Sequence, residues 1–383
     1  MHNRKTIVIV GMLNSVHLAR WVTQFAAEPI DFVLVPSTPT SSIHPLILRA
    51  RDAHATNGAS FEVATTFLLH SKAIWVLDRL LSTGIRGRGL ARILSSVEAN
   101  FVHILEFQHA GYLFLDSLKR YSRSNAEVIV TNYGSDIYWF KQYPRDLEKI
   151  KDLLGVADRY SAECQRDVDL AVGYGFKGRV LPVIPNAGGF SANELSASAD
   201  EARLRRKIMI KGYDGWVGRA RLALDAVERI QDELEDYEIV VYSADRSTVR
   251  RVRELEKHTK LRISLYRKNS LSHDEMLDHF RSSKLYLGVS LSDGISTSLL
   301  EALVAGCVPI QTFTACTDGW FTDGEEGVVL QDFEVDSVVR AIRSGIQIAD
   351  NFNHEKRAGQ QSRLSAKLLD EGIFELAKTY YAD

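Results

Sequence analysis

Short β-branched strands alternate with amphipathic helices in two separate arrays, and this alternation most constrains the fold of the chain. The first array has apolar runs at 7–10, 32–35, 101–105 and 128–131. The second array has strand-like runs at 207–211, 237–242, 262–266, 285–289 and 307–310. Continuous apolar runs separated by helices are typical of parallel strands that are buried on both faces. The sequence therefore predicts an α/β protein with two Rossmann-like, doubly wound domains.

The length of 383 residues also favours two domains, because a single hydrophobic core rarely grows that large. We expect an N-terminal domain over residues 1–189 and a C-terminal domain over 204–363. Small polar residues over 190–203 predict a linker between them. The amphipathic segment over 364–383 has no strand after it, and we expect a helix there that crosses back to the N-terminal domain.

Charge and cysteine content exclude several classes of protein. The formal net charge of −2 provides no overall basic field for nucleic acid. The odd count of three cysteines argues against a disulfide framework, and the lack of a C-x-x-C pair argues against a structural zinc site. The N-terminal apolar run is too short for a signal peptide, and no run approaches the ~20 apolar residues of a spanning helix. These features predict a cytoplasmic protein.

Two charged segments need an interpretation. The basic run over 84–94 contains Arg86, Arg88 and Arg92 between apolar residues. One interpretation is a solvated helix with one apolar face packed inward. The other is a surface that contacts an anionic acceptor or anionic lipid at the membrane periphery. The triplet at 167–169, Asp-Val-Asp, is interpreted as a solvated helix end and not as a metal site.

The most informative segment is a strand–turn–helix over 285–306. Asp293 and Gly294 form a turn after the strand, and Glu301 lies inside the following helix. Ligands of open α/β sheets bind outside the carboxyl ends of the strands, where helix N-termini present unpaired N–H groups. This turn can therefore hold a phosphate or sugar hydroxyls, with both acids as acceptors. The alternative interpretation is that Asp293 only caps the helix.

A second segment follows the first strand of the C-terminal domain. Lys211, Gly212 and Arg219 belong to a glycine-rich stretch that opens the next helix. Backbone amides and two cations together suit a diphosphate. The alternative is that Arg219 is an ordinary surface residue of that helix.

The acids at 293 and 301, eight residues apart, resemble the acidic-x7-acidic motif of the family-four retaining glycosyltransferases with the GT-B fold. The resemblance extends through Ala302, Gly306, the strand at 308–310 and the segment 319–330. The family more often has glutamate where this chain has Asp293. The resemblance implies two Rossmann-like domains that face each other across a cleft.

The same resemblance implies a role for each residue of the donor site. Lys211, Arg219 and Asp293 are the expected catalytic groups there, and the two cations would stabilise a leaving diphosphate without a metal ion. Glu301 would contact the ribose hydroxyls of a UDP- or GDP-linked sugar, which is a substrate and not a cofactor. The remaining expected donor-binding residues are Gly212, Tyr266 near the base, Gly294, Ile295, Ser296 and Thr297.

The N-terminal domain would bind the acceptor. His109 follows a strand and is the candidate to orient an acceptor hydroxyl, although a lone histidine is often a packed structural residue. The run at 132–137 resembles the family's histidine-glycine-serine-aspartate segment, with Tyr133 in place of the histidine. Asp136 in that run could also be a simple helix cap. The other expected acceptor-side residues are Gly11, Asn14 and His17.

The sequence thus predicts retaining transfer of a hexosyl-type sugar from a nucleotide-diphosphate sugar. The acceptor would be a glycan or lipid-linked molecule of bacterial-type surface polysaccharide or glycoconjugate synthesis. Two alternatives stay open, namely a nucleotide-sugar epimerase of the same fold and a non-catalytic relative that binds nucleotide-sugar. Asp293 and Tyr133 are the departures that keep the second alternative open.

Overall fold

The chain forms two compact units in the computed structural model, which describes residues 4–39, 42–120, 125–195, 204–351 and 354–383. The first unit comprises Met1–Gly188 and Ile373–Asp383, and the second comprises Gly189–Gly372. Of the linker expected over 190–203, residues 196–203 lie outside the described residues. Within 190–195, a short helix α10 (Ala192–Leu195) forms.

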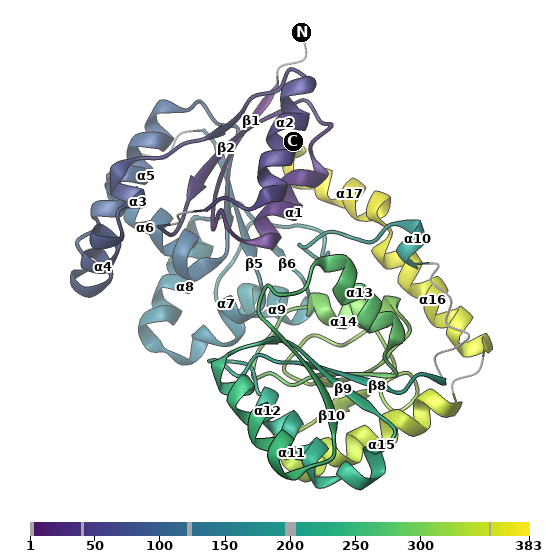
Figure 1. Ribbon diagram of the computed structural model, residues 1–383. Coiled ribbons are helices and arrows are strands. Elements are labelled where there is room, and N and C mark those ends of the chain that lie inside the picture. Colours follow the sequence, from purple (N-terminus) through teal and green to yellow (C-terminus); the bar gives the residue numbers. More distant parts are fainter. Residues whose placement is uncertain (1–3, 40–41, 121–124, 196–203, 352–353) are drawn as a thin grey trace. The chain divides into compact units, whose positions relative to one another are not determined.

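The first unit is built on a seven-stranded parallel sheet of order β3-β2-β1-β4-β5-β6-β7 (Figure 1). The chain winds outward from β1 to β3 and then returns to the other side of β1, so the order reverses between β1 and β4. The strands are β1 (Lys5–Gly11), β2 (Ile30–Pro36), β3 (Phe61–Val63), β4 (Phe101–Leu105), β5 (Glu127–Asn132), β6 (Arg159–Ala162) and β7 (Arg179–Val180).

Helices cover both faces of this sheet. Val8 and Val10 of β1 pack with one apolar cluster, whereas Ile7 and Ile9 pack with another, because strand side chains alternate between faces. Ser15 caps the first helix by accepting a hydrogen bond from the His17 amide. The helices are α1 (Val16–Gln24), α2 (Pro45–Thr56), α3 (Phe67–His70), α4 (Lys72–Leu81), α5 (Ile85–Ser96), α6 (Tyr112–Leu118), α7 (Ser135–Tyr138), α8 (Pro144–Val156) and α9 (Gln165–Gly173), with a π-helical turn over Phe107–Gly111.

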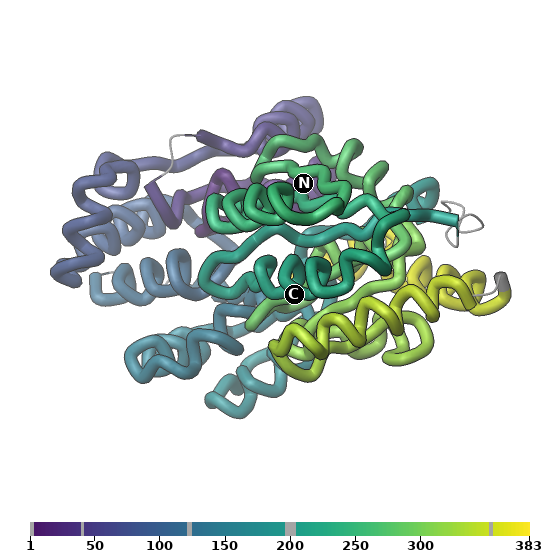
Figure 2. Tube along the Cα trace, turned by 60° about the horizontal axis from the view of Figure 1, so that its bottom comes forward, coloured from purple at the N-terminus to yellow at the C-terminus, as the bar shows by residue number. Residues whose placement is uncertain are grey.

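The second unit holds a six-stranded parallel sheet of order β10-β9-β8-β11-β12-β13, which reverses between β8 and β11. On one face, α11 packs beside both α12 and α15 (Figure 1 and Figure 2). Helices α13 and α14 pack against each other on the opposite face of the sheet, over β8, β11 and β12. The elements are β8 (Lys207–Lys211), α11 (Ala220–Arg229), β9 (Glu238–Ala244), α12 (Arg246–His258), β10 (Arg262–Arg267), α13 (His273–Ser282), β11 (Leu285–Gly288), α14 (Thr297–Val304), β12 (Val308–Thr312), β13 (Val328–Leu330), α15 (Val335–Asn351) and α16 (His354–Leu368).

The C-terminal segment differs from the single helix expected over 364–383. Helix α16 ends at Leu368, because the next residue, Leu369, forms a backbone bridge with Phe190. A further helix α17 (Asp370–Lys378) follows, and the boundary between the two units falls within it. Beyond it, Tyr381 is buried in the first unit, where its hydroxyl bonds both Trp21 and His103 at 2.8 Å.

Two charged segments differ from the sequence-based interpretation. Arg86 on α5 is buried and not on the surface, because its guanidinium donates to the Ser37 carbonyl at 2.8 Å. Burial lowers the pKa of Arg86 to about 10. Arg88 and Arg92 of the same helix are exposed. The interpretation of the 167–169 triplet as solvated is wrong for Asp167, which is fully buried and pairs with Arg166 at 2.8 Å. No helix within the described ranges is both long and apolar enough to cross a membrane.

Candidate functional site

Lys211 and Asp293 meet at the carboxyl edge of the second sheet, at its topological switch point. Lys211 ends β8, and Asp293 lies in the loop after the neighbouring strand β11. The Lys211 Nζ lies 3.5 Å from the Asp293 Oδ2 and donates to the Ser296 Oγ at 3.3 Å. Burial lowers the pKa of Lys211, but the charge and hydrogen bond of Asp293, together with Tyr286 and Glu301, outweigh burial and leave that pKa above its ordinary value. The ammonium group is therefore charged and held at the edge of the sheet where ligands bind.

The N-terminus of α14 opens beside this ion pair. Ser296 is the N-cap residue in extended conformation, yet its hydroxyl makes no cap hydrogen bond and accepts from Lys211 instead. The amides of Leu299 and Leu300 bond the Ser296 carbonyl. The amides of Thr297 and Ser298 make no hydrogen bond within the described residues. Unpaired amides and a fixed ammonium together form an arrangement that suits an anion.

Glu301 is buried one turn further into α14, with 2% of its surface exposed. Its Oε1 lies 3.1 Å from the Nε2 of His273, the first residue of α13. A buried carboxylate next to a half-exposed imidazole can accept from ligand hydroxyls at the rim of the site. Sequence reasoning missed His273, because 28 positions separate it from Glu301 and only the packing of α13 on α14 joins them.

The glycine-rich loop over 212–219 lies along the same edge. The Arg219 amide donates to the Val289 carbonyl at 2.9 Å, and Gly218 forms a backbone bridge with Ser290 after β11. The guanidinium donates to the Gly218 carbonyl at 2.6 Å and to the Gly215 carbonyl at 3.3 Å. Arg219 is the residue immediately before α11. Its side chain is held against its own loop, so it is not the freely solvated helix residue of the alternative interpretation.

The tightness of this loop explains its glycines. A Cβ at Gly218 would lie 2.0 Å from the Tyr213 carbonyl oxygen. A Cβ at Gly212 would lie 2.7 Å from the Tyr242 carbonyl oxygen. Neither position has room for a side chain, because the loop backbone closes on itself and on β9.

The remaining expected donor-site residues occupy different places. Gly294 and Ile295 are buried, and the Gly294 carbonyl accepts from the Cys316 amide at 3.0 Å, which ties the turn to the loop after β12. The ring of Tyr266 in β10 contacts that of His279 in α13 in a tilted arrangement, with 4.9 Å between the centroids.

In the first unit, the expected acceptor-side residues gather at the carboxyl ends of β1, β4 and β5. Gly11 ends β1, Asn14 is exposed in the turn after it, and the ring of His17 lies 5.1 Å from that of Tyr133. His109 lies in the π-helical turn after β4, and burial lowers the pKa of its imidazole. The structure brings these residues to the switch point of the sheet, where it reverses between β1 and β4.

A pair of buried carboxyl groups supports this edge. Glu106 accepts from the His109 amide at 2.7 Å and from the Ala110 amide, and its φ of 75° is unusual for a residue with a side chain. Asp136 accepts from the amides of Tyr133 at 3.1 Å and Phe107 at 3.3 Å. The interpretation of Asp136 as a helix cap is wrong, because it bonds the loop before α7 and the segment after β4. Sequence reasoning missed Glu106 altogether.

These two carboxyl groups have perturbed proton affinities. Burial and the nearby charge of Asp136 raise the pKa of Glu106 to about 8. Burial raises the pKa of Asp136 to about 7. Near neutral pH the pair therefore retains protons that exposed carboxyl groups would have lost.

Comparisons with known proteins bear on both units. Residues 192–364 match the family "Glycosyl transferases group 1". The sucrose-phosphate synthase of Thermosynechococcus elongatus superimposes with a TM-score of 0.72 and 12% identity, covering 99% of this chain and 98% of that one. Anabaena Alr3699/HepE in complex with UDP and glucose has a TM-score of 0.66 and 12% identity, covering 99% and 100%.

A third similar structure is the pneumococcal O-GlcNAc transferase GtfA in complex with UDP and GlcNAc. Its TM-score is 0.66 at 10% identity, and the match covers 99% of both chains. No curated protein sequence matches this chain. The likeness confirms the expected α/β fold with two doubly wound units, which is the GT-B fold of glycosyltransferases.

Proposed function

We propose that this chain is a glycosyltransferase whose second unit, largely the part that matches the group 1 family, binds a nucleotide-diphosphate sugar. The observation that carries the proposal is the charged Lys211 beside Asp293 at the N-terminus of α14, one turn from the buried Glu301. The similar structures from Anabaena and pneumococcus contain UDP with a sugar, which supports a donor of the same chemical class.

The diphosphate of the donor binds where amides and cations converge. The Thr297 and Ser298 amides and the Lys211 ammonium supply donors for phosphate oxygens. Arg219 adds a second cation along the same edge of the sheet. Negative charge builds on the leaving diphosphate as the glycosidic bond breaks, and fixed cations stabilise that charge without a metal ion.

Glu301 selects for the nucleoside part of the donor. Its carboxylate accepts from the ribose hydroxyls, and His273 holds the carboxylate in place through Oε1. Asp293 accepts from a hydroxyl of the transferred hexosyl group while it also orients Lys211. Transfer retains the anomeric configuration, as expected for a chain with this acidic pair.

The first unit binds the acceptor at the edge formed by Gly11, His17, His109 and Tyr133. The neutral imidazole of His109 orients an acceptor hydroxyl. The acceptor is a glycan or a lipid-linked molecule of surface polysaccharide or glycoconjugate synthesis. The enzyme acts in the cytoplasm, where the exposed Arg88 and Arg92 allow contact with the membrane periphery.

Calorimetric titration with UDP and with GDP tests the donor site. We expect one nucleotide to bind, and Glu301→Gln to weaken it by about tenfold because the ribose loses a charged acceptor, a difference of ~1.4 kcal/mol. Glu256→Gln, at an exposed glutamate of α12, is the matched control and retains wild-type affinity. Equal affinity in all three proteins would refute the assignment of the ribose site.

Product analysis then separates the alternative functions. A glycosyltransferase consumes its nucleotide-sugar only when an acceptor is present, apart from slow hydrolysis. An epimerase turns over the nucleotide-sugar with no acceptor. A non-catalytic relative binds the nucleotide-sugar and leaves it unchanged under every condition. Either of the last two results would overturn the proposed transfer while leaving the donor site in place.

A further inference from the structure

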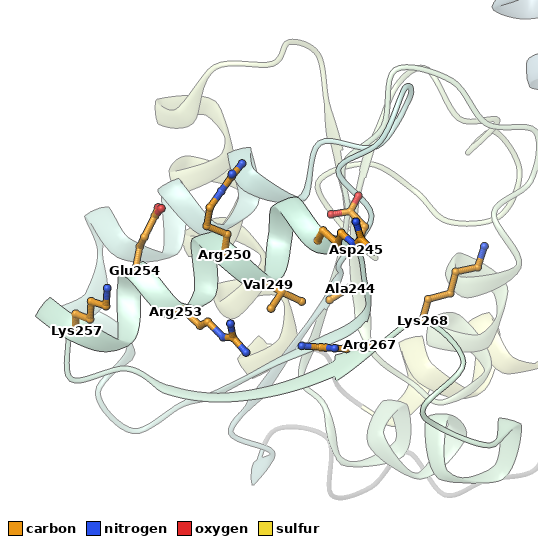
Figure 3. A pocket seen from close by; sticks show the side chains of 10 residues that line it. Ala244, Asp245, Val249, Arg250, Arg253, Glu254, Lys257, Arg267 and Lys268 are labelled. Carbon is orange, nitrogen blue, oxygen red and sulfur yellow. The ribbon is translucent and has the colours of Figure 1, made fainter.

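A basic groove lies along α12 of the second unit, where the loop after β9 and the end of β10 meet the helix (Figure 3). It has a volume of about 780 Å³. Figure 3 shows the guanidinium groups of Arg253 and Arg267 reaching towards each other across it. Its cationic lining residues, four from α12 and two from the end of β10 and the following turn, are Arg246, Arg250, Arg253, Lys257, Arg267 and Lys268.

The two acids in the lining are already engaged in the fold. Asp245 caps α12 by accepting from the Thr248 amide at 3.0 Å, and it also accepts from the Asp214 amide at 2.8 Å. Glu254 lies 4.0 Å from Arg251, which does not belong to the described lining of the groove. The six cations of the lining outnumber these two carboxylates, so the groove keeps a positive charge.

The six cations themselves have no acidic partners. None of them makes a salt bridge with any residue that the structure describes. Arg251 on the same helix differs, because it pairs with Asp225 at 2.7 Å and also with Glu228. The helix thus has one compensated basic face and one uncompensated basic face.

An anion bound here would relieve the repulsion between these exposed cations. Arg246 and Arg250 are four residues apart, and Arg250 and Arg253 are three apart, so like charges repel along the helix. The groove is concave, which focuses the positive potential. Guanidinium forks match the oxygens of phosphate in bidentate geometry. The protein as a whole carries a net charge of −2, so this concentration of positive charge is local.

The groove lies on the opposite side of the sheet from the proposed donor site. The ring of Tyr266 contacts that of His279 in α13, whereas the next residue, Arg267, lines the groove beside α12. Glu301 and His273 belong to the side of α13 and α14. The two places meet at Ala244, which packs against Gly212, and at Asp245, which lines the groove and accepts from the Asp214 amide of the glycine-rich loop.

The lining residues indicate which kind of anion fits the groove. The cations of α12 lie between Arg246 and Lys257, eleven steps or about 16 Å along the helix, so they match several phosphates and not one. Among the described lining residues none is aromatic, which leaves nothing on which nucleic acid bases could stack. The apolar residues in this described lining are Ala244 and Val249, which are too small a surface for insertion into lipid.

We propose that this groove is a binding site for a soluble small molecule that carries two or more phosphate groups, separate from the donor site. The volume is within the range of small-molecule pockets. The ligand neutralises the α12 cations and lies next to Asp245, which holds the glycine-rich loop. The proposal goes beyond the proposed function and does not depend on it.

Calorimetry with tripolyphosphate as the probe, at about 0.15 M salt, tests the site. We expect wild type to bind tripolyphosphate at least about tenfold more tightly than inorganic phosphate, and the double variant Arg253→Gln/Arg267→Gln to lose about tenfold in affinity. The control double variant Arg221→Gln/Arg340→Gln removes two exposed arginines elsewhere in the same unit and retains wild-type affinity.

Further measurements separate the groove from its alternatives. Lys211→Ala should retain tripolyphosphate binding, because the donor site is not the place where the probe binds. Loss of binding in Lys211→Ala, or equal loss in both double variants, would overturn the proposal. It would also fail if vesicles containing anionic lipid bound the protein through Arg253 and Arg267 while tripolyphosphate did not bind. Circular dichroism confirms that each variant is folded.

Discussion

The buried carboxyl pair of the first unit makes the stability of that unit depend on pH. Glu106 and Asp136 are 5% and 7% exposed. Burial and the charge of Asp136 raise the pKa of Glu106 to about 8, and burial raises that of Asp136 to about 7. In the unfolded chain both groups titrate near their ordinary values of ~4. Between these values and the folded pKa values, the folded state binds more protons than the unfolded state.

The sign of the effect follows from this difference. A carboxyl pKa that is raised in the folded state favours folding at low pH, and this contribution is lost as pH rises through the folded pKa. For Glu106, a change from about pH 6 to about pH 8 removes about 2 kcal/mol from the free energy of unfolding. Asp136 removes about 1 kcal/mol over the same interval.

The substitution Glu106→Gln should remove the larger part of this dependence. The glutamine oxygen can still accept from the His109 and Ala110 amides, but the side chain no longer titrates. We expect wild type to lose about 3 kcal/mol of stability from about pH 6 to about pH 8, and the variant to lose only about 1 kcal/mol. Glu98→Gln, at an exposed glutamate of the same unit, should keep the wild-type dependence.

Hydrogen exchange of the β4 amides measures this free energy for the first unit alone. Peptides over Phe101–Leu105 are followed by mass spectrometry, with rates corrected for the intrinsic effect of pH on exchange. The same pH dependence in wild type and Glu106→Gln would refute the reasoning, because it would mean that Glu106 is ionised in the folded protein at neutral pH. A steeper dependence in the variant would have the same consequence.

Three further predictions concern the donor site, the C-terminal tail and the surface of α5. Lys211→Ala should slow sugar transfer more than it weakens binding of free nucleotide, because Lys211 acts on the departing diphosphate; equal losses in steady-state kinetics and calorimetry would contradict this. Tyr381→Phe should destabilise the first unit by about 1–3 kcal/mol in urea unfolding, because it leaves a buried indole N–H and an imidazole without their shared hydroxyl partner. Arg88→Gln/Arg92→Gln should reduce flotation with anionic liposomes at low salt, and no flotation of wild type would end the membrane hypothesis.

Much of the fold could be predicted from local sequence patterns. The β-branched runs at 7–10 and 207–211 are strands β1 and β8, and Ser272 caps α13 as its position before that helix predicts. A capping box, in which the side chain of Glu275 returns to the Ser272 amide, completes that helix start. Such features depend on neighbours within a few residues, so the sequence carries them directly.

The candidate site could be predicted only in part. The spacing of Asp293 and Glu301 around a strand–helix turn indicated the second unit's site, and the structure places Lys211 next to Asp293 there. The roles of these residues remain predictions. His273 and Glu106 carry no sequence signal of their own, because a histidine before a helix and a glutamate after a strand are common and their partners come from elsewhere in the fold.

The sequence by itself therefore determined many of the strands, the doubly wound class of both units and the strand–helix turn of the candidate site. Only the tertiary structure decided that Arg86 is buried on α5 while Arg246, Arg250 and Arg253 of α12 line a basic groove. It also decided that Tyr381 closes against β4 and that two carboxyl groups share a buried edge. The physical reason is that burial, ion pairing and proton affinity depend on contacts between residues far apart in the chain, whereas strand and helix formation depend mainly on local periodicity.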